Sequence, residues 1–268
     1  MNDPDAVRKA LQDIETVFHS AAMVSVPRCT KEPELAKRIN VEGTRNLLRI
    51  AADSKVERFV FASSAAVYGN SQDLPLKADS QTGPISVYGE SKLEAEKLCL
   101  EMHRQTGLGT TVLRYFNVYG PRSLGGEYGS VINKFMQRLE KMKSPIINGD
   151  GSATRDFIYA KDVARANVLA ASNRVSSGKV YNVASGKRTT ISEVADLEMR
   201  LILGKNLVLP LEYRPASKED ILHSYADVTA IREELGFEAR YSLEEGLTEY
   251  FKTMFPSLPL SWQSAECG

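Results

Sequence analysis

The sequence contains few of the residues that build metal sites and disulfide frameworks. Its 268 residues include only three cysteines, Cys29, Cys99 and Cys267, and three histidines. These residues are scattered along the chain and do not follow the close spacing of zinc ligands, so we expect no metal site. An odd, scattered set of cysteines also does not fit a disulfide framework, which indicates a reducing compartment, the cytoplasm.

The sequence also lacks an excess of charge of either sign. Lys+Arg and Asp+Glu each total 34, and the formal net charge is +0. It contains no basic stripe for a nucleic acid and no polybasic tail for an anionic membrane surface. No apolar run approaches the roughly 18 residues that a membrane span needs, and the N-terminus does not resemble a signal peptide. We therefore expect neither a nucleic-acid nor a membrane partner.

What the sequence does contain is a regular alternation of strand and helix patterns, in a composition (43% hydrophobic, 25% charged) typical of globular proteins. Connections of crossover length between predicted strands favour an α/β fold with a parallel sheet and right-handed crossovers. Gly120-Pro121 interrupts the pattern, and shorter elements follow. We predict a Rossmann-like domain over 1–122 and a smaller α/β domain over 123–268, with segments that return to the first. The predicted elements are helices 4–12, 33–53, 86–106, 128–141, 160–172, 191–202, 227–235 and 243–254, strands 16–22, 57–62, 110–115 and 179–183, and a hairpin at 146–151.

The stretch from Ser63 to Lys92 contains the candidate catalytic groups. Ser63 and Ser64 follow an apolar strand, and ligands of open α/β sheets bind beyond the carboxyl ends of the strands. Tyr88 and Lys92 are four residues apart, on one face of the predicted helix 86–106. A neighbouring ammonium lowers the pKa of a phenol, ordinarily about 10, and makes it a better general base. Taken alone, this pair more often represents a surface tyrosine and a solvated lysine, but the strand and Ser-Ser that precede it favour a catalytic pair.

Two further features remain open on the residues alone. The strand 16–22 ends in Ser20-Ala21-Ala22, small residues that either let a flat ligand approach the backbone or form a tight turn. Asn40 lies inside the predicted helix 33–53, where a polar residue is usually a satisfied structural group. A contact from Asn40 to a ligand is the less common alternative.

In their order along the chain, these motifs resemble those of the extended short-chain dehydrogenase/reductases, the NAD-dependent epimerase/dehydratase group. Within that group the sequence most resembles the UDP-glucose and UDP-N-acetylglucosamine 4-epimerases. The matching segments are 17–22, 25–28, 40–44, 63–69, 88–92, 114–122, 149–163, 181–183 and 220–227.

The resemblance implies a role for each matching position. The catalytic residues that the resemblance implies are Ser64, Tyr88 and Lys92. The residues that it places against NAD are Ala21, Ala22, Asn40, Ser63, Tyr88, Lys92 and Tyr115. The residues that it places against a UDP-sugar substrate are Ser25, Ser64, Tyr88, Asn117, Arg155, Arg214 and Ser224. It also implies a homodimer through helices 33–53 and 86–106.

The implied reaction is oxidation of the sugar at C4 with NAD, turning of the 4-keto sugar, and return of the hydride to the opposite face. Dehydratases of the family have an acidic pair after the strand-end Ser or Thr, and decarboxylases have a Glu in this stretch. Here Ala65 and Ala66 occupy those positions and cannot donate a proton. The resemblance therefore favours a 4-epimerase, with another nucleotide-sugar oxidoreductase of the family as an alternative. A small residue at Ser224 makes N-acetylated sugars admissible.

One family motif is absent. The family begins with a strand and a Gly-x-x-Gly-x-x-Gly turn that holds the pyrophosphate at a helix N-terminus, and these 268 residues contain no such turn. We expect a chain that lacks the N-terminal part of the domain, so that the strand 16–22 forms an open edge of the sheet. The alternative is a short, catalytically impaired family member that binds nucleotide sugars or serves as a dimerising subunit.

Overall fold

The computed structural model describes the chain except residues 2, 124–129, 205, 217–220 and 256–268, and it confirms an α/β architecture with a parallel sheet. The helices are α1 (Pro4–Ala10), α2 (Val26–Lys31), α3 (Pro33–Lys37), the π-helical η1 (Arg38–Glu42), α4 (Gly43–Asp53), the 3-10 helix η2 (Ala65–Tyr68), α5 (Val87–Thr106), α6 (Val131–Leu139), α7 (Ala160–Ser172), the 3-10 helix η4 (Arg174–Ser176), α8 (Ile191–Leu203), α9 (Thr229–Leu235) and α10 (Leu243–Met254).

The main sheet has the strand order β1-β2-β3-β8, and all of its neighbouring strands are parallel. These strands are β1 (Thr16–His19), β2 (Arg58–Ser64), β3 (Gly109–Tyr115) and β8 (Lys179–Val183). Each of the inner strands β2 and β3 is almost wholly buried, as the continuous apolar runs of the sequence predict for a parallel sheet covered on both faces.

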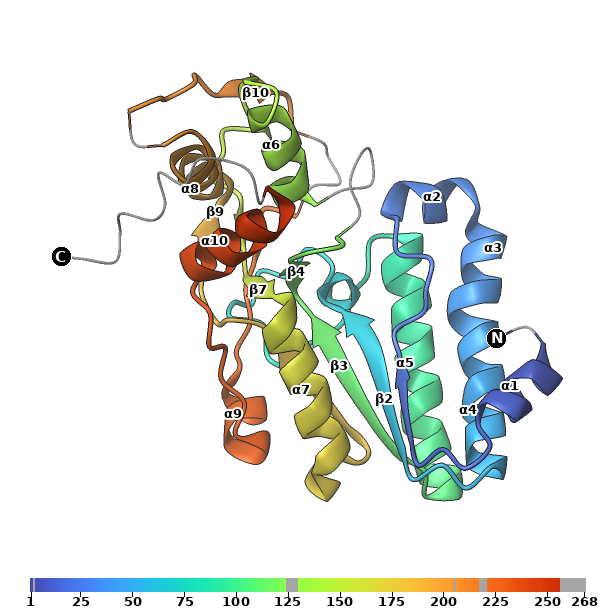
Figure 1. The fold of residues 1–268 in the computed structure, drawn as a ribbon. Helices are drawn as coiled ribbons and strands as arrows, with labels where there is room; N and C mark the ends of the chain where they lie inside the picture. Colours follow the sequence, from blue (N-terminus) through green and yellow to red (C-terminus); the bar gives the residue numbers. More distant parts are fainter. Residues whose placement is uncertain (2, 124–129, 205, 217–220, 256–268) are drawn as a thin grey trace.

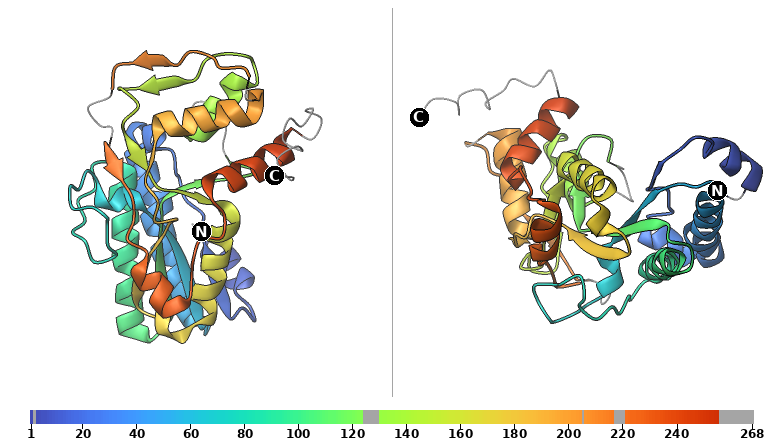
Figure 2. Two further views of the ribbon diagram at one scale, coloured as in Figure 1. Left: turned by 90° about the vertical axis from the view of Figure 1, so that its left-hand side faces the viewer. Right: turned by 90° about the horizontal axis from the view of Figure 1, so that it is seen from below.

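Helices cover both faces of the main sheet (Figures 1 and 2). The helices α4 and α5 pack on one face, where Phe59 and Phe61 of β2 and Val112 of β3 form a buried cluster with Leu48. On the other face α7 packs over β2 and β3, with Val60 in its cluster. The alternating residues of β2 therefore supply both faces, because successive strand side chains point to opposite sides.

The helices α6, α8 and α10 lie beyond the carboxyl ends of the main-sheet strands (Figure 1). The short strands there form three small sheets, β10-β5, β11-β6-β9 and β4-β7. Their bounds are β4 (Asn117–Tyr119), β5 (Ile146–Asn148), β6 (Thr154–Arg155), β7 (Phe157–Tyr159), β9 (Thr189–Thr190), β10 (Glu212–Arg214) and β11 (His223–Ser224). The strand β8 and the helix α7 also come from the second half of the sequence. However, β8 belongs to the main sheet, and α7 packs on one of its faces.

The hairpin predicted at 146–151 is wrong. Gly149 and Gly151 both have positive φ and turn the chain, but β5 and β6 do not pair with each other. Instead β5 pairs in parallel with β10, and β6 pairs with β11 and β9. The turn residues specify the local reversal, whereas partners far along the chain decide the pairing.

Three local features refine the predicted elements. The helix predicted over 33–53 is continuous and contains the π-helical turn η1, which includes Asn40. The helix α2, which begins after the N-cap Ser25, was not among the predicted elements. The strand predicted over 16–22 ends at His19, and the following segment leaves the sheet.

Within the described residues, β1 pairs with β2 alone and forms an edge of the main sheet. Its side chains alternate between the two faces: His19 is buried with Phe59 and Phe61, whereas Phe18 is 49% exposed. This edge therefore presents a large aromatic side chain to solvent, as the sequence analysis expected for an open strand.

Candidate active site

Ser63 and Ser64 end β2, and the two hydroxyls have different environments. Ser63 is buried, and its hydroxyl donates to Glu96 of α5, which also accepts two hydrogen bonds from the Arg114 guanidinium. Ser64 is partly buried, and its hydroxyl accepts from the Ala66 amide at 3.2 Å as the N-cap of η2. Because the Ser63 hydroxyl is held by a buried ion pair, Ser64 is the better placed of the two to contact a ligand.

Tyr88 lies in the first turn of α5, with its phenol near enough to the Ser64 side chain for Ser64 to lower the pKa of the phenol in part. Gly89 makes this approach possible, because a Cβ at that position would stand 2.6 Å from the Ala66 carbonyl oxygen. A larger residue would push the first turn of α5 away from η2. Ser86 caps the same turn by accepting from the Gly89 amide at 3.1 Å, which fixes where the helix begins.

Lys92 follows one turn later and is almost fully buried. Its ammonium donates to the Ala62 carbonyl oxygen at 2.7 Å and lies 4.9 Å from the centre of the Phe61 ring. Burial lowers the pKa of Lys92 to about 8, because a charged amine loses its hydration in the interior.

The pKa of Tyr88 differs from the expectation drawn from the Tyr–Lys spacing. Burial raises the pKa of the Tyr88 phenol above its ordinary value, and the hydrogen bond with Ser64 lowers it only in part. The net direction is therefore opposite to the lowering that we expected from Lys92, whose ammonium is engaged by the Ala62 carbonyl. In this arrangement the phenol keeps its proton at neutral pH.

Asn40 connects the segment after β1 with the turn that contains Tyr88. Its Oδ1 accepts from the Met23 amide at 2.8 Å, and its Nδ2 donates to the Met23 carbonyl at 3.0 Å and to Ser91 Oγ at 2.9 Å. The Ser91 hydroxyl donates in turn to the Tyr88 carbonyl at 2.8 Å. Asn40 is 2% exposed, so these protein groups satisfy most of its hydrogen-bonding capacity.

The other residues predicted to contact the cofactor lie at the same end of the sheet. Ala21 is exposed and Ala22 partly buried, in the segment that follows β1. Tyr115 ends β3, and its hydroxyl donates to Asn167 Oδ1 of α7 at 2.8 Å. Burial raises the pKa of Tyr115 to about 12, so it is not a candidate base at neutral pH. The Ser25 hydroxyl, predicted to contact substrate, accepts from the Arg28 amide at 3.2 Å as the cap of α2.

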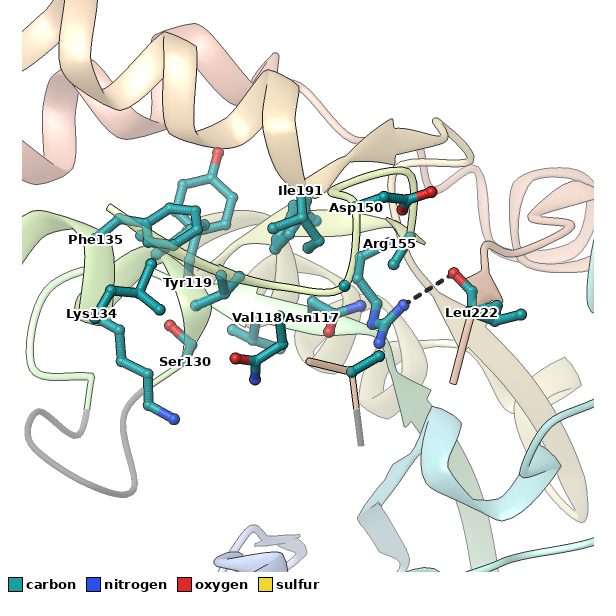
Figure 3. Close-up of a pocket in the computed structure, with 18 residues that line it drawn as sticks. Asn117, Val118, Tyr119, Ser130, Lys134, Phe135, Asp150, Arg155, Ile191 and Leu222 are labelled. Carbon is teal, nitrogen blue, oxygen red and sulfur yellow. Dashed lines mark hydrogen bonds between the residues drawn. The ribbon is translucent and has the colours of Figure 1, made fainter. Parts of the chain in front are cut away.

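A separate pocket of about 350 Å³, here called the Asn117 pocket, contains two of the predicted substrate residues (Figure 3). Asn117 and Arg155 line it together with residues that sequence analysis did not single out, among them Ser130 and Lys134 of the α6 region. In Figure 3, Lys134 and Arg155 lie on opposite sides of Asn117 and Val118. Arg155 donates to the Thr154 carbonyl at 2.9 Å and Asn117 to the Asp156 carbonyl at 3.0 Å.

Arg214 and Ser224 have different places. Ser224 is nearly buried on β11, paired with Arg155 of β6. Arg214 is exposed on β10 and does not line the Asn117 pocket; it lines a neighbouring one. The structure thus brings Ser64, Tyr88 and Lys92 into one group and Asn117 and Arg155 into another, while Arg214 stands apart.

Asp156 holds the segments around the Asn117 pocket together. Its fully buried carboxylate accepts from the Ser185 amide at 2.8 Å, the Gly186 amide at 2.9 Å and the Ala226 amide at 3.3 Å. Burial raises the pKa of Asp156 to about 6 despite these donors. Its partners lie 29 to 70 residues away along the chain, so sequence spacing gave no signal for this role.

Two absences concern membranes and metal ions. Within the described residues, no helix combines the length and apolar character that a bilayer span requires. The same residues also contain no group of three or more His, Cys, Asp or Glu side chains placed to hold a metal ion.

Comparison with known proteins identifies the family. Residues 1–184 match the model of the NAD dependent epimerase/dehydratase family. The chain belongs to this family. It is 34% identical over 237 residues (88% of this chain, 75% of the relative) to a putative UDP-glucose 4-epimerase of Methanocaldococcus jannaschii. It is 31% identical over 256 residues (92% of this chain, 78% of the relative) to a UDP-N-acetyl-alpha-D-glucosaminuronate decarboxylase of Bacillus cytotoxicus.

The fold of the family member from Thermotoga maritima is also similar. The crystal structure of its UDP-glucose 4-epimerase with UDP-glucose superimposes with a TM-score of 0.90 at 32% identity, over 96% of this chain and 83% of that one. Because this chain and the Thermotoga maritima structure superimpose over nearly the whole chain, the two proteins share one fold.

Three side chains of this site have hydrogen-bond donors that suit the ribose hydroxyls of NAD. The family is NAD-dependent, and the donors of Ser64, Tyr88 and Lys92 have the chemistry to bind the hydroxyls of the nicotinamide ribose. The family's Gly-x-x-Gly-x-x-Gly turn, which holds the pyrophosphate at a helix N-terminus, does not occur in these 268 residues.

Proposed function

We propose that this family member is a UDP-sugar 4-epimerase whose proton-transfer group is Tyr88, assisted by Ser64 and Lys92. The observation that carries the proposal is that Ser64, at the carboxyl end of β2, lies near enough to the Tyr88 phenol to lower its pKa in part, one helical turn from a buried lysine. Ligands of open α/β sheets bind at this end of the strands.

The three side chains have distinct roles in the proposed reaction. NAD, when bound, supplies the reversible acceptor for the hydride of the sugar C4. Ser64 holds the sugar O4 by a hydrogen bond. Tyr88 first releases its own proton to solvent, and the phenolate then takes the O4 proton and later returns it. Loss of the phenol proton needs a compensating positive charge, because burial raises the pKa of Tyr88; the Lys92 ammonium, one turn away, supplies it.

The Asn117 pocket is the proposed site of the nucleotide. A guanidinium fork suits a diphosphate, and the Arg155 side chain lines this pocket beside Asn117. Its volume of about 350 Å³ lies in the range of small-molecule pockets. The sugar would extend from this pocket to Tyr88.

The residues after Ser64 favour epimerisation over dehydration and decarboxylation. Ala65 and Ala66 begin η2 directly beside the Ser64–Tyr88 contact. An acid in that position could protonate a leaving hydroxyl, and alanine cannot. The alternatives are another nucleotide-sugar oxidoreductase of the family, and a nucleotide-sugar binder or dimerising subunit of impaired activity.

The test of this function combines binding with turnover. Isothermal titration of NAD into the purified chain, with circular dichroism as a folding check, establishes whether the cofactor binds. An assay of C4 epimerisation follows with UDP-glucose and with UDP-N-acetylglucosamine, and Tyr88→Phe should abolish it while UDP binding persists. A folded chain that binds UDP and NAD but turns over neither sugar would refute the epimerase.

We also propose that copies of the chain associate through α4 and α5, which pack together on one face of the main sheet. Size-exclusion chromatography with light scattering measures the mass. A monomer over the micromolar range would contradict the dimer without affecting the proposed chemistry.

A further inference from the structure

A second pocket lies next to the Asn117 pocket, and its wall is positively charged. It has a volume of about 510 Å³ and is formed by α6, the turn after it and the strands β5 and β10. The cationic side chains that line it are Lys134, Arg138, Lys141, Lys143 and Arg214. Among the described residues, its lining includes no carboxylate. We call it the basic pocket.

This concentration of charge does not follow from the composition, because the chain has equal numbers of cationic and anionic residues. Lys134 and Arg138 are four residues apart on α6, and Lys141 lies two residues beyond the end of this helix. Like charges at this spacing repel one another and weaken a helix. The helix dipole favours cations at the end of α6, which accounts for Arg138 and Lys141, but it disfavours Lys134 in the first turn.

The cations converge from separate parts of the chain. Arg214 lies on β10, directly opposite Asn148 of β5 in the parallel register. Arg138 is held in place by hydrogen bonds to the Ser144 carbonyl and, at 3.0 Å, to Glu212. The tertiary structure therefore assembles this wall from residues up to 80 positions apart, around the buried Phe135 ring. A charged cleft with an apolar wall focuses the electric field and attracts counter-ions.

The basic pocket and the Asn117 pocket share four lining residues but differ in their charged ends. Lys134, Phe135, Ile146 and Asn148 line both. Arg155 lines only the Asn117 pocket. The cations that line only the basic pocket are Arg138, Lys141, Lys143 and Arg214. The two pockets therefore adjoin, and each has cationic side chains that the other lacks.

We propose that the basic pocket is a second anion site, which binds a multiply charged phosphate compound beside the ligand of the Asn117 pocket and independently of it. Ammonium and guanidinium groups are the side chains that suit phosphate oxygens. Because most of these cations are exposed, binding should weaken steeply as salt is added.

Isothermal titration of inorganic pyrophosphate into the full chain tests the proposal, with and without saturating UDP. We expect two binding events without UDP and one with it. The double variant Lys141→Glu/Lys143→Glu should weaken the event that UDP leaves by at least tenfold. The control Lys9→Glu/Lys252→Glu changes the net charge by the same amount, at exposed positions outside both pockets. It should change the affinity of the remaining binding event by less than twofold.

Each outcome decides between the sites. Complete displacement of pyrophosphate by UDP, or equal weakening in the two double variants, would overturn the second site. Arg155→Ala should remove only the event that UDP displaces. If UDP does not bind at all while pyrophosphate binds and depends on Lys141 and Lys143, the second site stands and the proposed nucleotide site fails.

Discussion

The side-chain amide of Asn40 stands 2.9 Å from Ser91 Oγ and joins two segments that lie 51 residues apart in the sequence. One is the loop after β1, held through both backbone polar groups of Met23; the other is the turn of α5 that contains Tyr88. The same side chain that the family resemblance places against NAD is thus also a structural clamp. Whether Asn40 touches the cofactor stays a prediction.

We expect Asn40→Ala to destabilise the chain by about 1–3 kcal/mol, because it leaves the buried Met23 amide without its partner and the Met23 carbonyl with only the weak Cys29 thiol donor. Urea unfolding followed by circular dichroism measures the change. The control Asn70→Ala removes an exposed asparagine and should alter stability by less than about 0.5 kcal/mol. Equal stability of the two variants would show that Asn40 does not act as a clamp.

Gly89→Ala should disturb Tyr88, because the added Cβ would stand 2.6 Å from the Ala66 carbonyl oxygen. Helix propensity alone favours alanine by about 1 kcal/mol, so a net loss of stability would show that the close approach dominates. The expected kinetic result is a drop in kcat of tenfold or more with little change in KM. Gly83→Ala is the matched control, since nothing lies within 4 Å of the position that its added methyl group would take.

The activity should depend on the charge of Lys92. Its pKa is lowered to about 8, so the fraction charged falls as pH rises through that value. In the proposed mechanism the ammonium compensates the Tyr88 phenolate, and kcat should therefore fall above about pH 8. Lys92→Arg keeps the charge at all these pH values, and any activity that remains should lose this decline. A flat wild-type profile between pH 7 and 9 would count against the role.

The pH dependence of stability should reflect Glu198, a fully buried carboxyl that has no hydrogen-bond partner among the described residues. Burial raises the pKa of Glu198 well above its ordinary value. The folded chain then binds a proton that the unfolded chain releases, so stability should fall as pH rises above about 4.3, the ordinary value, toward the folded pKa. Thermal unfolding between pH 4 and 8 measures this.

Glu198→Gln should remove that contribution to the pH dependence, whereas Glu233→Gln, at an exposed position, should leave it unchanged. Glu198→Met should also raise the free energy of unfolding at neutral pH, by about 1–3 kcal/mol, because an apolar side chain bears no desolvation cost. A less stable Glu198→Met chain would contradict this account.

The β1 edge should promote self-association through Phe18, which is 49% exposed on a strand that pairs on one side only within the described chain. Phe18→Lys places a charge on this edge and should lower concentration-dependent light scattering. Val208→Lys changes an even more exposed apolar residue, at 75%, outside the main sheet and is the control. An equal effect of both variants would indicate a general gain in solubility.

The sequence alone determined the fold class and the order of the main elements. The apolar runs at 57–62 and 110–115 and the helical pattern at 86–106 are strong local signals, and the structure contains β2, β3 and α5 at these places. The spacing of Tyr88 and Lys92 on one helix face also followed from helical periodicity. These features depend on near neighbours in the chain, which is why a pattern can indicate them.

Only the tertiary structure decided the features that depend on distant partners. Consecutive strand residues point to opposite faces, so the sequence could not say which of Ser63 and Ser64 faces a ligand; the buried Glu96–Arg114 pair engages Ser63. It likewise could not foresee that β5 pairs with β10, because the Gly149 turn specifies a reversal and not a partner. The raised pKa of Tyr88 and the basic pocket have the same origin, since burial and the field of assembled charges arise only when separate segments pack together.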